Sequence, residues 1–133
     1  MTQDATITVE IAPGELFDKI TILEIKSERI TDTAKLENVR VELTALANAR
    51  DAAITSFAKL ADLTGQLKSI NEQLWDIEDD IRDCERGQDF GEKFVELARS
   101  VYKSNDQRAA LKRDINMLLG SHLVEEKSYI NYV

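Results

Sequence analysis

Arg108 is the residue of this sequence whose type and position most strongly suggest anion binding. It interrupts a series of apolar residues spaced three and four apart, in which Ser104 is the other polar member. A guanidinium keeps its proton at ordinary pH, so an arginine within an apolar helix face requires an anionic partner. In a continuous helix that partner is Glu72, an acid of an earlier helix such as Asp18, or a ligand. If the helix instead breaks at residues 104–106, Arg108 turns toward solvent or a structural acid, and this is the simpler interpretation.

A run of carboxylates upstream of Arg108 is the second candidate for chemistry. It comprises Glu72, Asp76, Asp79, Asp80 and Asp83, which recur at helical spacing. Such a set can hold Mg²⁺ for a phosphohydrolase. The all-α nucleotide pyrophosphohydrolases use paired E-x-x-E and E-x-x-D motifs, and the acidic pairs of this chain differ from these in order and composition. A charge run opposite an apolar face is usually a solvated face, so we predict neither a metal site nor a cofactor.

Other polar and aromatic residues have weaker patterns. Trp75 lies beside an apolar series, which predicts either packing against an earlier helix or the wall of a ligand site or interface. The least acidic part of the chain contains Arg99, Lys103, Lys112 and Arg113. These cations can bind a phosphate, but we expect them to pair with the acids of residues 72–83 or with a second subunit. His122 has no second histidine to share a metal.

Helical periodicity predicts the elements that position these residues. Helices are expected at 13–30, at 34–60, from a turn at 62–65 to residue 86, and from about residue 90 to 120, the last being one helix or two. The strongest pattern is a seam that steps by four and three, formed by Leu63, Leu67, Ile70, Leu74, Ile77, Ile81 and Cys84. We expect an antiparallel companion helix along this seam.

The two ends of the chain have a different pattern. Thr6–Ile11 alternates polar and β-branched apolar residues, which predicts a short strand. Ser128–Val133 can form a second strand and pair with the first. The predicted fold is therefore mainly α, a single helical domain over residues 1–133, built as an antiparallel bundle of long helical hairpins with a short two-stranded β ribbon from the termini.

Composition and charge exclude several function classes. The 133 residues carry 17 Lys and Arg against 25 Asp and Glu, a net charge of −8, which disfavours nucleic acid and anionic membranes as partners. The single Cys84 forms no intrachain disulfide and fits a reducing compartment. The N-terminus lacks the basic and apolar regions of a signal peptide, and no apolar run approaches the roughly 20 residues that span a bilayer. A cytoplasmic location is the expectation.

Several sequence blocks resemble those of a known but uncharacterised family of short bacterial and bacteriophage proteins, about the length of this chain. The blocks are Pro13–Leu16 with Asp18–Leu23, Asn71–Glu72 with Leu74–Trp75 and Ile77–Glu78, Val101–Tyr102 with Asn105–Asp106 and Arg108–Ala109, and Glu125–Tyr129. The resemblance covers nearly the whole chain and is weakest in the predicted second helix. It implies no activity and no catalytic residue, because the family has none assigned.

The same blocks hold polar and aromatic residues from four separate segments. They are Asp18, Lys19, Trp75, Glu78, Asn105, Asp106, Arg108, Lys127 and Tyr129. If the fold brings them together, they form one polar ligand pocket with an aromatic wall. The alternative, which we favour slightly, is a structural network that locks the terminal ribbon onto the helices.

Three functional hypotheses follow in order of preference. The first is a non-enzymatic helical protein that forms a homo-oligomer or binds a protein partner through its helix faces. The second is a small-molecule or anion-binding protein, or a small enzyme, with a polar pocket around Arg108. The third is the Mg²⁺-dependent phosphohydrolase.

Overall fold

A computed structural model describes residues 5–133 of the chain and contains four α-helices. They are α1 (Pro13–Arg29), α2 (Thr33–Ala53), α3 (Ala58–Arg86) and α4 (Glu92–Leu118). Within residues 5–133 there is no strand. The predicted mainly α class is therefore confirmed. None of the described helices is long and apolar enough to span a membrane.

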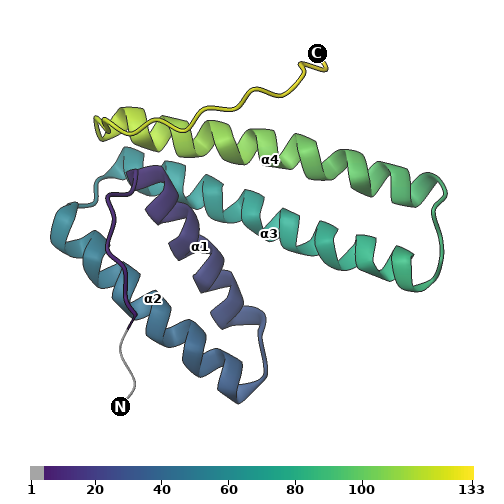
Figure 1. The fold of residues 1–133 in the computed structure, drawn as a ribbon, viewed down its shortest axis with the longest axis horizontal. Coiled ribbons are helices and arrows are strands. Elements are labelled where there is room, and N and C mark those ends of the chain that lie inside the picture. Colours follow the sequence, from purple (N-terminus) through teal and green to yellow (C-terminus); the bar gives the residue numbers. More distant parts are fainter. Residues whose placement is uncertain (1–4) are drawn as a thin grey trace.

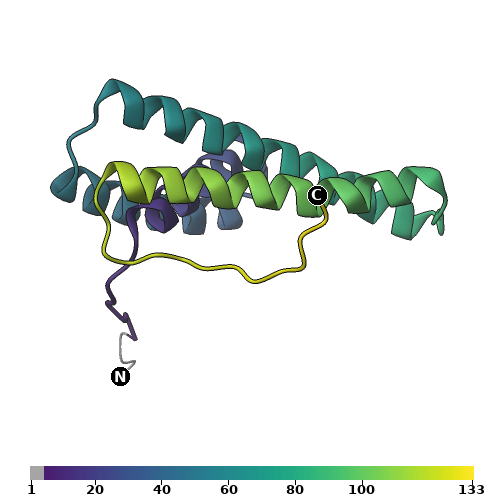
Figure 2. The ribbon, with the colours of Figure 1, turned by 90° about the horizontal axis from the view of Figure 1, so that it is seen from above.

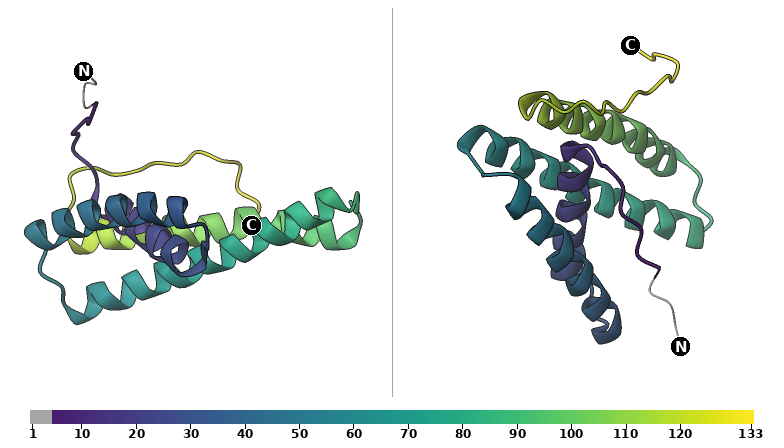
Figure 3. Two further views of the ribbon diagram at one scale, coloured as in Figure 1. Left: turned by 90° about the horizontal axis from the view of Figure 1, so that it is seen from below. Right: turned by 60° about the vertical axis from the view of Figure 1, so that its left-hand side comes forward.

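The helices form two hairpins that cross each other. The long helices α3 and α4 run side by side in opposite directions, joined by a short turn (Figure 1). The α1–α2 hairpin lies obliquely across them, as the right-hand view of Figure 3 shows. Helix α1 packs against all three other helices, whereas α2, among the described helices, packs only against α1. Helix α1 is therefore the central element of the fold.

Residues at the helix ends explain where three of these helices begin or end. Pro13 occupies the first turn of α1, where its missing N–H costs nothing. Asp32 caps α2, because its carboxylate accepts a hydrogen bond of 2.9 Å from the backbone N–H of Lys35. Helix α4 ends before Gly120, whose φ of 67° is the left-handed conformation that glycine adopts without strain.

The hydrophobic core lies where α1 meets α3 and α4. It is formed by Phe17, Leu60, Leu63, Leu67, Ile70 and Ile115. Five members of the predicted seam are buried, with Leu67 fully so, and the other two, Ile77 and Ile81, are half-buried. Burying such a side chain contributes about 1.5–3 kcal/mol. The seam prediction is confirmed.

The predicted β ribbon is wrong. Thr6–Ile11 and Ser128–Val133 are both non-helical, and neither is a strand. Figure 2 shows why they do not pair: the N-terminal segment leaves the helices, while the C-terminal segment runs back along α4. His122 and Glu10 approach to 3.4 Å near the point where the two segments diverge. An alternating pattern forms a strand only when a neighbouring strand supplies hydrogen bonds.

The boundary between the second and third helices was also predicted in the wrong place. Helix α2 ends at Ala53 rather than residue 60, and α3 begins at Ala58. Ile54 and Phe57 are extended, which lets Leu60 enter the core from the first turn of α3, where it is 1% exposed. Residues 62–65, predicted as a turn, are part of α3. Leu63 is buried in the core, whereas Asp62 and Gly65 on either side of it are exposed to solvent.

Helix α4 is continuous through residues 104–106. This settles the two alternatives for the last helix in favour of one long helix with a polar centre. Arg108 therefore lies on the same helix as the apolar residues that precede and follow it.

Candidate functional site

The centre of the candidate site is a two-point ion pair between Arg108 of α4 and Asp18 of α1. Arg108 Nε donates to Asp18 Oδ1 over 2.9 Å, and Arg108 Nη2 donates to Asp18 Oδ2 over 2.5 Å. Asp18 is 1% exposed and the Arg108 side chain is 30% exposed. The helix break in the simpler interpretation is absent, since α4 continues through residues 104–106, but Arg108 does pair with a structural acid. Its partner is one of the acids considered for a continuous helix.

Two further buried side chains hold the carboxylate of Asp18 in place. Asn71 of α3 donates from Nδ2 to Asp18 Oδ1 and to Thr21 Oγ1, each over 3.0 Å. The Thr21 hydroxyl donates to the backbone oxygen of Asp18 over 2.8 Å. Among the described residues, no buried side-chain nitrogen or oxygen lacks a hydrogen-bond partner. The network therefore joins α1, α3 and α4 with its polar groups satisfied.

The network keeps Asp18 charged. Burial acts to raise the pKa of the Asp18 carboxyl, but the hydrogen bonds from Arg108 and Asn71 and the charges of Arg108 and Lys112 outweigh it. The pKa of Asp18 therefore lies below its usual value. The hydrogen bonds to Asp18 likewise raise the pKa of Arg108. Both groups are ionised at neutral pH.

A second ion-paired cation lies one helical turn further along α4. Lys112 Nζ is 2.7 Å from Glu15 Oε2 of α1 and 3.0 Å from Glu125 Oε2 of the C-terminal segment. Burial acts to lower the pKa of Lys112, but the two carboxylates reverse this and raise it. Lys112 thus ties the start of α1 and the C-terminal segment to the same point of α4.

Close backbone packing fixes α1 against α4 at this point. The N–H of Gly14 donates to Asn116 Oδ1 over 2.6 Å. A Cβ atom on Gly14 would lie 2.3 Å from the backbone oxygen of Lys112. Because real side chains do not approach so closely, only glycine permits this contact. The contact places Asp18, one turn later on α1, opposite Arg108.

Two cavities adjoin Arg108, and a third shares Asn105 with both of them. The first, which we call the Trp75 cavity, measures about 450 Å³ and is lined by Ile22, Ile25, Asn71, Leu74, Trp75, Glu78, Asp79, Arg82, Asn105 and Arg108. The second, the Lys112 cavity, measures about 220 Å³ and is lined by Asn105, Arg108, Ala109, Lys112, Glu125 and Lys127. The third, the tyrosine cavity, measures about 610 Å³ and is lined by Val101, Tyr102, Asn105, Asp106, Lys127, Tyr129, Ile130 and Tyr132. Asn105 lines all three cavities.

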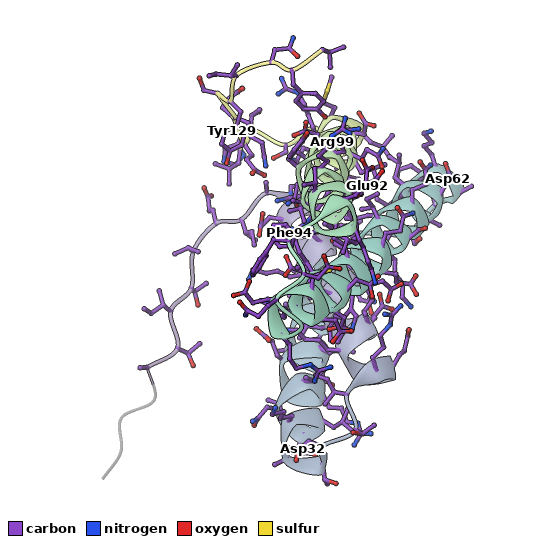
Figure 4. The ribbon with its side chains drawn as sticks, turned by 90° about the vertical axis from the view of Figure 1, so that its right-hand side faces the viewer. Asp32, Asp62, Glu92, Phe94, Arg99 and Tyr129 are labelled. Atoms are coloured by element: carbon purple, nitrogen blue, oxygen red, sulfur yellow. The ribbon has the colours of Figure 1, made fainter. Side chains whose placement is uncertain are left out.

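The structure brings most of the predicted pocket residues around these cavities. Trp75, Glu78, Asn105 and Arg108 line the Trp75 cavity, while Asn105, Asp106, Lys127 and Tyr129 line the tyrosine cavity. Asp18 lies behind Arg108 as its partner. Figure 4, viewed toward the α3–α4 turn, shows Tyr129 on the C-terminal segment beside α4. Lys19 differs from the rest, because it is exposed and lines none of the three cavities.

Three acids of the predicted acidic face of α3, Glu72, Asp76 and Asp83, form surface ion pairs. Asp76 accepts a hydrogen bond of 2.6 Å from Arg29 of α1, whose guanidinium also lies 5.8 Å from the centre of the Trp75 ring. Asp83 pairs with Arg86 on the same helix over 3.0 Å. In the part of the chain that the structure describes, no group of three or more His, Cys, Asp or Glu side chains is placed to hold a metal ion.

The basic residues of α4 pair with other acids than predicted. Arg99 pairs with Glu96 of its own helix over 3.4 Å, and Arg113 lies 3.8 Å from Glu126. Lys112 pairs with acids of α1 and the C-terminal segment, as described above, and Lys103 is exposed. The predicted pairing with the acids of α3 is therefore wrong for the three paired cations. Asp76 instead pairs with Arg29 of α1, whereas Glu78 and Asp79 line the Trp75 cavity together with Arg108 of α4.

Sequence reasoning missed several members of the site. Asn71 was quoted within a matching block but not recognised as a partner of Asp18, and Thr21, Glu15 and Glu125 were not assigned any role. One signal was present: Asp18 and Thr21 are one turn apart on a helix whose other core-facing residues are apolar. Two polar residues in such a position usually bond to each other or to a third polar group.

A comparison with protein families identifies the family of this chain. The model of a family of unknown function, DUF6165, matches residues 7–133. The chain belongs to this family. The match includes all four helices and the C-terminal segment with Glu125 and Lys127. No curated protein and no solved structure matches the chain. Because the family has no assigned function, the site itself must supply the functional argument.

Proposed function

We propose that this protein binds a small anionic molecule beside Arg108, and that Arg108 is the group that recognises the anion. One observation carries the proposal. Arg108 uses Nε and Nη2 to bind Asp18, and among the described hydrogen bonds none involves Nη1. A guanidinium held at two points by a buried acid presents its remaining N–H groups in a fixed direction. Arg108 lines both the Trp75 and the Lys112 cavities.

The energetics of the ion pair support a binding role. A buried ion pair is seldom more stabilising than apolar residues of the same size, because desolvation offsets the attraction. The presence of this pair therefore favours a role besides stability. Asn105, which lines all three cavities and is half-buried, offers an amide beside the guanidinium. In the Trp75 cavity these polar groups adjoin apolar walls formed by Ile22, Ile25, Leu74 and Trp75, a combination typical of small-molecule sites.

The charge balance limits the affinity for a simple anion. Asp18 neutralises Arg108, and Glu15 and Glu125 more than neutralise Lys112. Lys127 is the remaining cation of the Lys112 cavity. The attraction for an anion must therefore come from oriented hydrogen bonds rather than from net positive charge, which makes a modest affinity the expectation.

Thermal unfolding in the presence of inorganic phosphate, sulfate, acetate and citrate tests the proposal, with sodium chloride at equal ionic strength as the reference. A ligand at about 100 times its Kd stabilises the folded state by about 2.7 kcal/mol. We expect a saturable rise in melting temperature for at least one anion. Asn105→Ala, which leaves the Arg108–Asp18 pair intact, should abolish the rise, and Arg108→Lys should weaken it.

The matched control for Arg108→Lys is Arg86→Lys. Arg86 is 84% exposed at the end of α3 and pairs with Asp83, so its replacement should leave the response to anions unchanged. A melting temperature of the unmodified protein that none of the four anions changes would reject the proposal. A rise that persists in Asn105→Ala would reject the location of the site.

Self-association is the second candidate function, and the exposure of α2 favours it. Of the α2 residues, Val39 alone is buried, and Val41 is 63% exposed. The helix is rich in alanine, which allows the backbone of another helix to approach closely. We infer that a second copy of the chain can dock on the exposed side of α2 that carries Val41. Light scattering coupled to size-exclusion chromatography tests this, and a strict monomer at micromolar concentrations, unchanged by Val41→Glu, would contradict it.

We also infer the setting in which the protein acts. The net charge of −8 disfavours nucleic acid as a partner. Cys84 is free and buried, which fits a reducing compartment such as the cytoplasm.

A further inference from the structure

The tyrosine cavity is the largest of the three cavities at the site, and it has the chemistry of a ring-binding pocket. Its 610 Å³ lie between the middle of α4 and the C-terminal segment, within the range of small-molecule sites. Three of the lining residues are tyrosines, and Val101 and Ile130 add aliphatic surface. A cavity with these walls removes a planar ring from water and contacts its faces and edges.

Contacts around the cavity hold its aromatic walls in place. The rings of Tyr102 and Tyr132 meet edge to face with their centres 5.2 Å apart. The carboxylate of Asp106 beside Tyr132 raises the pKa of the Tyr132 hydroxyl. Lys127 Nζ lies 5.6 Å from the centre of the Tyr129 ring. Each tyrosine of the cavity therefore has a defined neighbour.

Two ion pairs connect the C-terminal segment, which supplies half of the cavity, to α4. Glu125 binds Lys112 over 3.0 Å, and Glu126 lies 3.8 Å from Arg113. These two contacts to α4 immediately precede Lys127. Figure 2 shows the segment running along α4 from this point toward the middle of the helix. Residues 127–132 lie beside residues 101–106 of α4, where residues of both segments line the tyrosine cavity.

Apolar surface in this cavity is left open to water. Tyr129 is 80% exposed, Ile130 is 94% exposed and Tyr132 is 54% exposed. Exposed apolar side chains around a concave surface mark a ligand-binding site when polar groups adjoin them. The adjoining polar groups are Asn105 and Lys127, which line both the tyrosine cavity and the Lys112 cavity.

We propose that the ligand is a small molecule in which a planar ring is joined to an anionic group, the ring occupying the tyrosine cavity and the anion lying at Asn105 and Arg108. The inference rests on the proposed function and adds the chemical class of the ligand. The shared residues Asn105 and Lys127 place the two halves of such a molecule side by side. The ring compensates for the modest attraction that the neutralised cations exert on the anion.

Matched pairs of probes test this class. Isothermal titration calorimetry compares the affinities of the protein for phenyl phosphate and methyl phosphate, for benzoate and acetate, and for adenosine monophosphate and ribose 5-phosphate. We expect the ring-bearing member of at least one pair to bind about 5-fold tighter or more, because one aromatic contact is equivalent to roughly 2- to 10-fold in affinity. Tyr129→Ala should remove this advantage without changing the binding of the ringless probe. Tyr129 is 80% exposed, so the fold tolerates its replacement.

Phe90→Ala is the control, because Phe90 is a 50% exposed aromatic residue before the start of α4. It should leave both members of each pair unaffected. Equal affinities within every pair, or a ring advantage that survives in Tyr129→Ala, would overturn the ligand class while the proposed anion site stood. Failure of every anionic probe to bind would overturn both proposals.

Discussion

Replacing Asp18 by asparagine tests the central contact of the fold. The amide keeps one oxygen for Arg108 Nε and Asn71, but its NH₂ group then faces Arg108 Nη2, where two donors oppose each other. Removing one partner of a buried ion pair costs about 3–5 kcal/mol. Since the Arg108 side chain is 30% exposed, water relieves part of this, and we expect Asp18→Asn to lower the free energy of unfolding by about 2–4 kcal/mol.

Urea denaturation at pH 7 measures this loss, and Asp76→Asn is the matched control. Asp76 also accepts a hydrogen bond from an arginine, Arg29, but its side chain is 64% exposed. A surface pair of this kind contributes at most about 1 kcal/mol. In a protein of this size, each kcal/mol corresponds to about 3–5 °C in melting temperature. A loss below about 1 kcal/mol for Asp18→Asn, or equal losses in the two variants, would refute the assignment of a buried, satisfied network.

The pH dependence of the same variant provides a second check. The pKa of Asp18 lies below its usual value in the folded protein. Its contribution is therefore fully present above the pKa of the unfolded chain, about 3.9, and is lost as the pH falls through the lower folded value. The difference in unfolding free energy between the unmodified protein and Asp18→Asn should shrink below about pH 4. A difference that stays constant into strong acid would contradict the ionised state of Asp18.

Three other predictions concern neighbouring contacts. Gly14→Ala should destabilise the fold by about 2 kcal/mol or more, because the new methyl group meets a backbone oxygen. Its control is Gly65→Ala, in open space on α3, which should stabilise the fold by up to about 1 kcal/mol. Equal effects of the two substitutions in urea denaturation would contradict the close packing of α1 on α4. Leu67→Ala should cost about 2–5 kcal/mol, since Leu67 is fully buried in the core, and a smaller loss would show that the seam is not packed. The carboxylates around Lys112 raise its pKa. The stabilisation that Lys112 gives the fold is therefore present below about pH 10.4, its pKa in the unfolded chain, and is lost as the pH rises through its pKa in the folded protein. The unfolding free energies of the unmodified protein and Lys112→Met should converge in strong alkali, and a constant difference between them would contradict this.

The parts of the fold that follow a regular period were predictable from sequence. The seam from Leu63 to Cys84 was identified because its residues repeat with the geometry of packed helices. The boundary at residues 54–57 was missed, since the apolar pattern of α2 continues through Ile54 and Phe57 into α3. Periodicity reports which residues face the core and says little about where the chain turns.

The candidate site was predictable in its members more than in its bonding. Arg108 was recognised because a charge within an apolar stripe requires a partner, and Asp18 was among the acids named. The choice between Asp18 and Glu72 depends on how α1 crosses α4, which no local pattern encodes. Tail residues such as Glu125 were beyond reach for the same reason, since the course of the C-terminal segment is set by contacts with residues far away in the chain.

The attachment of α1 to α4 has a consequence for how the chain folds. Gly14 and Asn116 are 102 residues apart in sequence, and Asp18 and Arg108 are 90 apart, whereas α3 and α4 meet across a turn of five residues, 87–91. Closing a short loop costs less entropy than closing a long one. The α3–α4 hairpin therefore assembles early, and α1 docks onto it late. During synthesis, α1 emerges from the ribosome before the other three helices, but its partners on α4 emerge only after α2 and α3.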